Sequence, residues 1–157
     1  MILTPHMLVG AAIGSKIKSY WAAFILATAL HFIFDRLPHW EYGRRYEIET
    51  ITRRGLFLFF LQALIDLFAG LAIVFWILWP EPFNRYVLFG ALMSILPDGL
   101  VLLYAFWAVV AKKRDNWLKK YYEFHKFFHI PDAKNKFLIG LFAEGLILLI
   151  ALLVFLN

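Results

Sequence analysis

The chain has 157 residues, of which 62% are hydrophobic and 19% are aromatic, and its mean hydropathy is +0.70. A soluble globular domain is only about half apolar, so this composition excludes an ordinary soluble domain and predicts an integral membrane protein. The formal net charge is +5, and the chain has no cysteine. Disulfides and thiolate chemistry are therefore excluded, and any metal must be bound by His, Asp or Glu. The length suits a single helical domain, residues 1–157.

The first predicted helix covers residues 4–15. Thr4 is a suitable N-cap, and Pro5 stands at the favoured first helical position. Gly10 and Gly14 are small residues at a spacing that lets a second helix approach closely. The segment is too short to cross a bilayer, which needs about 20 residues, so we expect a half-spanning or re-entrant helix. No basic region or cleavage site precedes it, and we expect no removable signal peptide.

Four more apolar segments follow. Residues 20–37 form the next predicted helix, and residues 55–79, 85–111 and 136–156 are long enough to cross a membrane. The polar stretch 36–54 is predicted to be a surface loop, and the basic, aromatic stretch 112–136 an interfacial helix ending in a turn at 130–132. We therefore expect an all-α fold: a polytopic integral membrane bundle of four to five membrane helices, one of them short or re-entrant, plus a cytoplasmic interfacial helix.

The basic residues predict the orientation of this bundle. Stretch 36–54 holds five Lys and Arg residues and stretch 112–136 holds eight, whereas the turn 80–86 between two predicted spans holds only Arg85. Both basic stretches thus lie on one face, which the positive-inside tendency places in the cytoplasm. The predicted location is the inner (cytoplasmic) cell membrane. The expected partners are the lipid bilayer and anionic lipid, and no nucleic acid is expected.

A recurring His/Asp pattern ends the second predicted helix. His31, Asp35 and His39 follow one another at intervals of four residues, so on a helix they share one face. Ionisable side chains in an apolar segment are costly and are usually functional. The pattern predicts a metal site anchored by His31 and Asp35, whereas His39 follows Pro38 and either stays on that face or leaves it.

Other segments bring further potential ligands. His125 and His129 have the spacing of a helical zinc pair, although in a basic aromatic helix they are equally compatible with a purely interfacial role. Asp98 follows Pro97 inside a predicted span, where a kink or unwound turn would free backbone carbonyls; the alternative is a structural kink with a capping aspartate. The predicted metal ligands are His6, His31, Asp35, His39, Asp98, His125 and His129. Nitrogen and oxygen ligands without cysteine favour zinc, as one or two ions.

Two more carboxylates lie within predicted spans. Asp66 and Glu144 are candidate catalytic residues, because a carboxylate close to a metal-activated water can accept its proton. They are equally compatible with a shared proton or a helix–helix contact.

The sequence resembles a known family. Thr4-Pro5-His6, the glycines at 10 and 14, the element His31-x3-Asp35-x2-Pro38-His39 and the later Pro97-Asp98 are similar to elements of the small membrane-bound metal-dependent hydrolases that include the LexA-binding inner-membrane hydrolases. More distantly, the chain is similar to the all-helical zinc-dependent phospholipases C. In that group the Pro-Asp element precedes His-x3-Asp, whereas here it follows. The resemblance implies a helical membrane fold and a hydrolase whose His and Asp residues bind divalent metal.

Three functions follow from these observations. The leading hypothesis is hydrolysis of a phosphoester, in a phospholipid or a lipid-linked phosphate, by metal-activated water. The first alternative is a non-catalytic membrane protein with a structural metal site, whose basic segment 112–130 binds lipid or a protein partner. The second is an ion or proton transporter that uses Asp66, Asp98 and Glu144, although the sequence lacks the inverted repeat common in such proteins.

Overall fold

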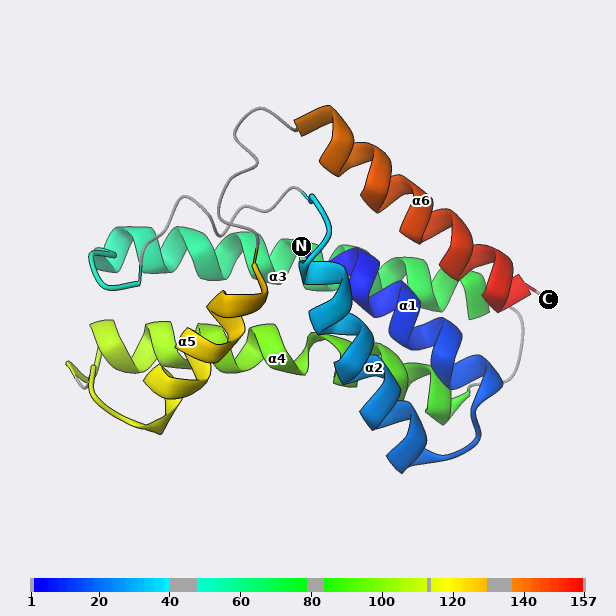
Figure 1. The fold of residues 1–157 in the computed structure, drawn as a ribbon, viewed down its shortest axis with the longest axis horizontal. Helices are drawn as coiled ribbons and strands as arrows, with labels where there is room; N and C mark the ends of the chain where they lie inside the picture. The colour runs from blue at the N-terminus through cyan, green and yellow to red at the C-terminus, as the bar shows by residue number, and fades with distance from the viewer. Residues whose placement is uncertain (1, 40–47, 79–83, 113, 130–136, 157) are drawn as a thin grey trace.

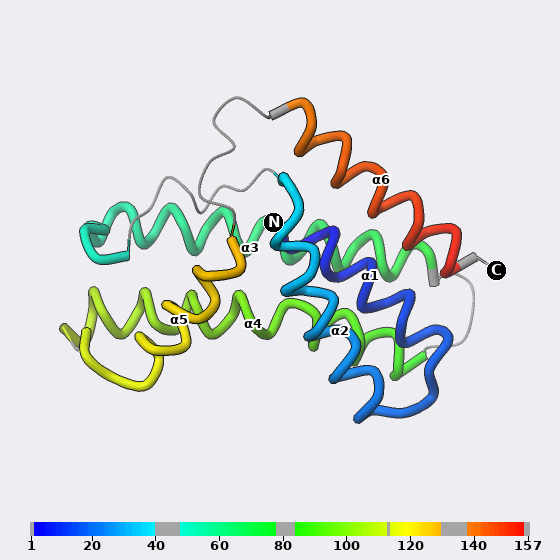
Figure 2. The backbone as a smooth tube through the Cα atoms, in the orientation of Figure 1, coloured from blue at the N-terminus to red at the C-terminus, as the bar shows by residue number. Residues whose placement is uncertain are grey.

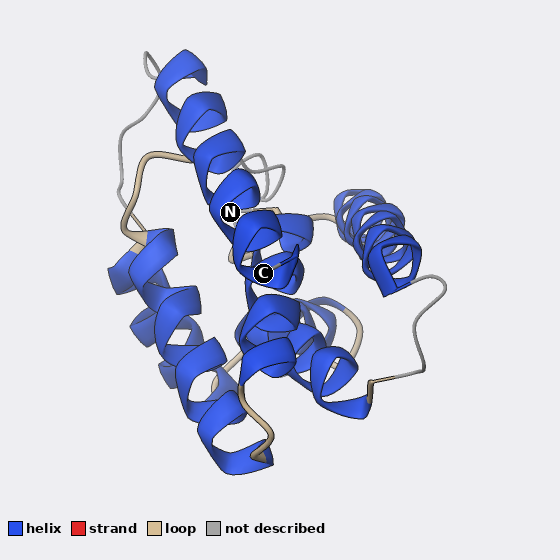
Figure 3. Cartoon of the chain, turned by 90° about the vertical axis from the view of Figure 1, so that its right-hand side faces the viewer, coloured by secondary structure: helices blue, strands red, loops and turns tan. Residues whose placement is uncertain are grey.

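The computed structural model describes residues 2–39, 48–78, 84–112, 114–129 and 137–156. Within these ranges the chain forms helices and loops and no strand, as Figure 3 shows. This confirms the all-α prediction. The described helices, in chain order, are α1 (Leu3–Lys16), α2 (Tyr20–Asp35), α3 (Arg53–Leu78), α4 (Arg85–Val109), α5 (Trp117–Phe128) and α6 (Phe137–Leu156).

Helix α1 is the centre of the molecule. It contacts α2, α3, α4 and α6, and Figures 1 and 2 show it between α6 on one side and α2 and α4 on the other. Residues 3–12 are all buried. Gly10 and Gly90 lie against each other, and a methyl group on either would overlap the backbone carbonyl oxygen of its partner. The predicted close approach of another helix to the small residues of α1 is therefore confirmed, and that helix is α4.

The start of α1 depends on a residue far away in the sequence. The expectation that Thr4 caps the helix is wrong, because α1 begins at Leu3 and Ile2 is its N-cap, with no capping side chain of its own. The carboxylate of Asp66, on α3, accepts hydrogen bonds from the backbone N–H groups of Leu3 and Thr4 and from the Thr4 hydroxyl. A buried helix start needs such acceptors for its free N–H groups, and α3 supplies them.

The two longest described helices, α3 and α4, run in opposite directions along the length of the molecule (Figure 1). Helix α5 crosses α4 and also contacts α2. Its Leu118 packs with Tyr104 and Ala108 of α4 and with Ile48 in a cluster of buried apolar side chains. Arg36, just after α2, donates a hydrogen bond to the carbonyl of Phe127 at 3.2 Å. These contacts hold α5 against the bundle.

Among the described residues, three helices are long and apolar enough to cross a membrane: α3, α4 and α6. Helix α2 is apolar but has only 16 residues, and α1 has 14. Large apolar side chains lie exposed on the outer faces; Trp21, Trp76 and Phe142 are 78%, 76% and 73% exposed. The predicted loop 36–54 is described only in part, because residues 40–47 lie outside the described ranges, as does the predicted turn at 130–132.

Candidate metal centre

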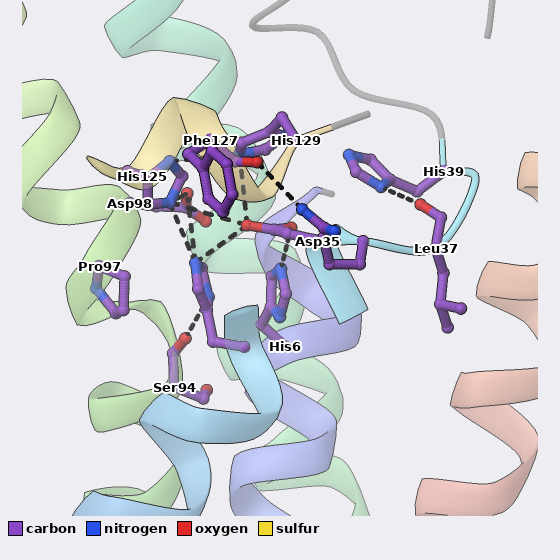
Figure 4. Close-up of polar contacts among 12 residues, drawn as sticks. His6, Asp35, Leu37, His39, Ser94, Pro97, Asp98, His125, Phe127 and His129 are labelled. Atoms are coloured by element: carbon purple, nitrogen blue, oxygen red, sulfur yellow. Dashed lines mark hydrogen bonds and ion pairs between the residues drawn. The ribbon is translucent and has the colours of Figure 1, made fainter. Parts of the chain in front are cut away.

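Four helices bring His and Asp side chains to one place: the first turn of α1, the end of α2, the middle of α4 and the end of α5 (Figure 4). His31, Asp35, Asp98 and His125 each offer one ligand atom, and the four atoms all lie within 4.8 Å of one another. We call this set the four-residue group. The side chains of His31 and Asp35 are fully buried, whereas that of Asp98 is 18% exposed.

The distances within the four-residue group suit a small cation. His31 Nε2 lies 3.2 Å from Asp35 Oδ2 and 3.2 Å from His125 Nε2. His125 Nε2 lies 3.3 Å from Asp98 Oδ1, and the diagonal distances are 3.7 and 3.8 Å. Four ligands at the usual zinc–nitrogen and zinc–oxygen lengths in a tetrahedron are separated by roughly 3.3–3.6 Å. These five separations are close to those of a tetrahedral site, and the group could therefore hold a metal ion.

The tautomer of His31 follows from its backbone contact. His31 Nδ1 lies 2.8 Å from the carbonyl oxygen of Ser94. A carbonyl can only accept, so Nδ1 carries the proton and the Nε2 lone pair of the neutral ring faces the group. Such a hydrogen bond, from the distal nitrogen to a carbonyl, is typical of metal-binding histidines.

The proline of α4 does not unwind the helix. Pro97 lies inside α4, which remains helical from Arg85 to Val109, so the unwound turn considered for this position is not present. Pro97 has no N–H to donate to the preceding turn. The carbonyl of Ser94, three residues earlier, accepts from His31, and that of Pro97 itself accepts from the Tyr121 hydroxyl at 3.2 Å. Two backbone carbonyls near Asp98 thus accept hydrogen bonds from side chains although the helix is not unwound there.

Asp35 also belongs to a second set. Asp35, His39 and His129 offer ligand atoms within 4.8 Å of one another, and we call them the three-residue group. His129 Nε2 lies 3.3 Å from Asp35 Oδ2. The Nδ1 of His39 donates to the carbonyl of Leu37 at 2.7 Å, which leaves the lone pair of its neutral ring on Nε2.

His6 lies beside both groups without belonging to either, among the described residues. Its Nε2 lies 3.2 Å from Asp35 Oδ1, and its ring faces that of His31 with the centroids 4.1 Å apart. The other six predicted metal ligands therefore lie around Asp35. That they bind an ion stays a prediction, but the buried groups could hold one.

The two predicted catalytic carboxylates lie elsewhere in the described structure. Asp66 is bound to the start of α1. Glu144 is buried on α6, a helix that packs against α1. Neither belongs to the two groups found in the described ranges. Their role in proton transfer stays a prediction, and Asp66 has a clear structural function.

Residues that the sequence did not indicate also support the site. Tyr121 lies one helical turn before His125, and burial, together with the nearby carboxylates of Asp98 and Asp35, raises the pKa of its phenol, which therefore stays neutral and can donate to Pro97. Phe32 packs edge-on against His31 and His125, with centroids 5.3 and 5.7 Å away. The spacing of Tyr121, His125 and His129 at four-residue intervals was the signal that could have identified the tyrosine.

No protein-family model matches the chain, and neither a curated protein nor a solved structure is significantly similar to it. Within the described ranges, fold and site together define the class: an all-helical protein with three helices able to span a membrane and a buried His/Asp centre that could hold a metal ion.

Proposed function

We propose that this protein is a membrane-bound, metal-dependent hydrolase that cleaves a phosphoester of a lipid or a lipid-linked phosphate. The observation that carries the proposal is the four-residue group, whose ligand atoms lie at the spacing of a tetrahedral site. Two carboxylates buried beside two imidazoles favour a positive charge between them, either a cation or a proton. The resemblance of the sequence to membrane-bound metal-dependent hydrolases accords with this function.

The ligand set favours zinc and a reactive site. Structural zinc sites usually include cysteine, whereas catalytic sites use His, Asp and Glu, and this chain has no cysteine. A bound divalent ion would supply an acidified water and positive charge for the phosphoryl oxygens. The four-residue group would hold that ion, and the carbonyl of Ser94 fixes the ring of His31. Asp98 Oδ2 is buried and has no hydrogen-bond partner among the described residues, so it is available to a bound water or substrate.

The surroundings of the site suit an anionic lipid substrate. The apolar outer faces of α3, α4 and α6 favour insertion in a bilayer. Helix α5, which carries His125, also carries Lys119, Lys120 and Lys126, and such a basic helix attracts anionic headgroups. His129 is 20% exposed, so a ligand could reach the centre from the end of α5. We place this end at the cytoplasmic face of the inner membrane, where the basic segments are expected.

A structural metal site is the second candidate, and one observation favours it. Four protein ligands fill a tetrahedral zinc site completely, and closed sites of this kind usually stabilise a fold. The ion would then fasten α2, α4 and α5 together without turnover, and the basic helix α5 would bind lipid or a partner.

Metal content and turnover measured on the same samples separate these functions. The wild-type protein in a phosphate-free maltoside detergent would be loaded with Zn2+ and assayed against lipid and soluble phosphoesters. The double variant His31→Ala, Asp35→Ala is expected to lose both zinc and turnover, whereas Asp115→Ala, which removes an exposed carboxylate, is expected to keep both. Turnover that survives the double variant would refute the enzyme. Zinc without turnover in the wild type, together with unfolding on zinc removal, would support the structural site.

A further inference from the structure

Asp35 lies at the junction of two sets of ligands. Its Oδ2 atom lies 3.2 Å from His31 Nε2 and 3.3 Å from His129 Nε2, and its Oδ1 atom lies 3.2 Å from His6 Nε2. A carboxylate has two oxygens with about four lone-pair positions, so it can bind more than one cation at once. In enzymes that use two metal ions, the ions are about 3.5–4 Å apart. Asp35 Oδ2, which faces both His31 and His129, is placed to bridge such a pair.

The remaining ligands of a second ion come from outside the four-residue group. His39 follows the end of α2, and its proton is fixed on Nδ1 by the carbonyl of Leu37. His129 follows the end of α5, with its ring centroid 5.5 Å from that of His39. Both imidazoles therefore lie next to Asp35 on the side away from Ser94, as Figure 4 shows. The three-residue group is a second, incomplete ligand set.

The charges predict when this second set can be filled. Asp35 and Asp98 together carry two negative charges, which one divalent cation neutralises. A second divalent cation would add two uncompensated positive charges to a largely buried site, which is strongly unfavourable. A phosphate monoester dianion carries close to two negative charges near neutral pH. The second cation and the phosphate group should therefore bind together.

A competing hydrogen bond also weakens the affinity of the three-residue group for a cation. His129 Nε2 lies 3.2 Å from His125 Nδ1. When His125 binds the first ion through Nε2, its proton is on Nδ1 and is donated to His129. A second ion must take that lone pair and break the hydrogen bond. The loss of one hydrogen bond corresponds to a somewhat less than tenfold weaker affinity for the second ion, before the charge is considered.

We propose that this protein binds a second divalent cation at Asp35, His39 and His129 only when a phosphate group occupies the centre. This inference rests on the proposed function, because it requires a first ion in the four-residue group. It deepens that function by naming the substrate chemistry as a phosphate monoester whose dianion links the two cations. A phospholipid with a monoester headgroup and a free phosphate share this chemistry.

Zinc stoichiometry with and without phosphate tests the inference. The whole protein in phosphate-free maltoside would be dialysed against micromolar Zn2+ in chloride buffer or with added inorganic phosphate, and zinc per protein would be measured by mass spectrometry. We expect one ion in chloride and two with phosphate, with the affinity for the second ion raised at least about tenfold. Nanodiscs of phosphatidic acid, compared with phosphatidylcholine alone, test the lipid source; a second ion with phosphatidic acid but not with inorganic phosphate would assign the site to the lipid headgroup.

The variants His39→Ala and His129→Ala test which residues hold the second ion. Both leave the four-residue group complete, so each variant is expected to keep one ion and to gain no second ion with phosphate. One ion in the wild type under every condition would overturn this inference alone. A second ion that needs no phosphate, or that persists in both variants, would also overturn it. No bound zinc under any condition would overturn the proposed function together with this inference.

Discussion

The contact between α1 and α4 gives the most quantitative prediction. Alanine at Gly10 would place its Cβ atom against the backbone of Gly90, overlapping the carbonyl oxygen and lying 2.7 Å from the carbonyl carbon. Ordinary contact begins at 3.4 Å. The two helices would therefore have to move apart, because neither backbone atom can rotate out of the way.

The expected magnitude follows from two opposing effects. Alanine is favoured over glycine within a helix by about 1 kcal/mol, whereas overpacking a well-filled interior costs about 1–3 kcal/mol and more where backbone must shift. With about 3 kcal/mol lost to a backbone overlap and about 1 kcal/mol gained from helix propensity, we expect Gly10→Ala to lower the free energy of unfolding by about 2 kcal/mol. Gly145→Ala is the matched control, because a Cβ there has no neighbour within 4 Å, and it should be neutral or stabilising by up to about 1 kcal/mol.

Reversible unfolding in mixed detergent micelles, followed by circular dichroism, measures both variants. The Cβ atom at residue 10 would also lie 2.7 Å from the Ser94 hydroxyl oxygen, and the Ser94 carbonyl orients His31. Gly10→Ala is therefore expected to bind zinc more weakly as well, whereas Gly145→Ala should bind it normally. Equal unfolding free energies for the two variants would refute the close contact of α1 with α4.

Three further predictions concern the residues around this core. Asp66→Ala should lower the unfolding free energy by about 1–2 kcal/mol, because the N–H groups at the start of α1 lose their acceptor. Zinc content should stay normal, and a loss of zinc would show that Asp66 of α3 contributes to the metal site. Removing zinc with a chelator should lower the thermal midpoint, since an ion at 1,000 times its Kd contributes about 4 kcal/mol; an unchanged midpoint would argue against a metal in the native state. Tyr121→Phe removes one hydrogen bond to Pro97 and should cost about 1 kcal/mol in unfolding free energy with zinc retained, whereas loss of zinc would make the tyrosine part of the ligand set.

The local parts of the site could be predicted from the sequence. His31 and Asp35 are four residues apart, and helical periodicity alone places them on one face. The same spacing brings His125, in the last turn of α5, next to His129, which follows directly after that helix. Small residues in the first segment predicted a close helix contact, which the structure places between Gly10 and Gly90. In each case the sequence signal lies within a few turns of one helix.

The parts that depend on packing between distant segments could not be predicted with the same certainty. A carboxylate inside an apolar helix suits catalysis and structure equally well, and only the position of α1 shows that Asp66 binds Leu3 and Thr4. Pro97 suggested an unwound turn, yet α4 stays helical there. His125 could have been an interfacial residue, and only the folding of α5 against α4 and α2 buries it beside Asp35.

X-ray absorption at the zinc K-edge of the zinc-loaded protein tests the central claim most directly, because it reports the ligands around the ion. The four-residue group predicts one ion surrounded only by nitrogen and oxygen, at about 2.0–2.2 Å, with scattering from two imidazole rings. The His31→Ala, Asp35→Ala variant should lose this spectrum. A zinc spectrum without imidazole scattering, or one unchanged in the double variant, would contradict a shared ion at His31, Asp35, Asp98 and His125.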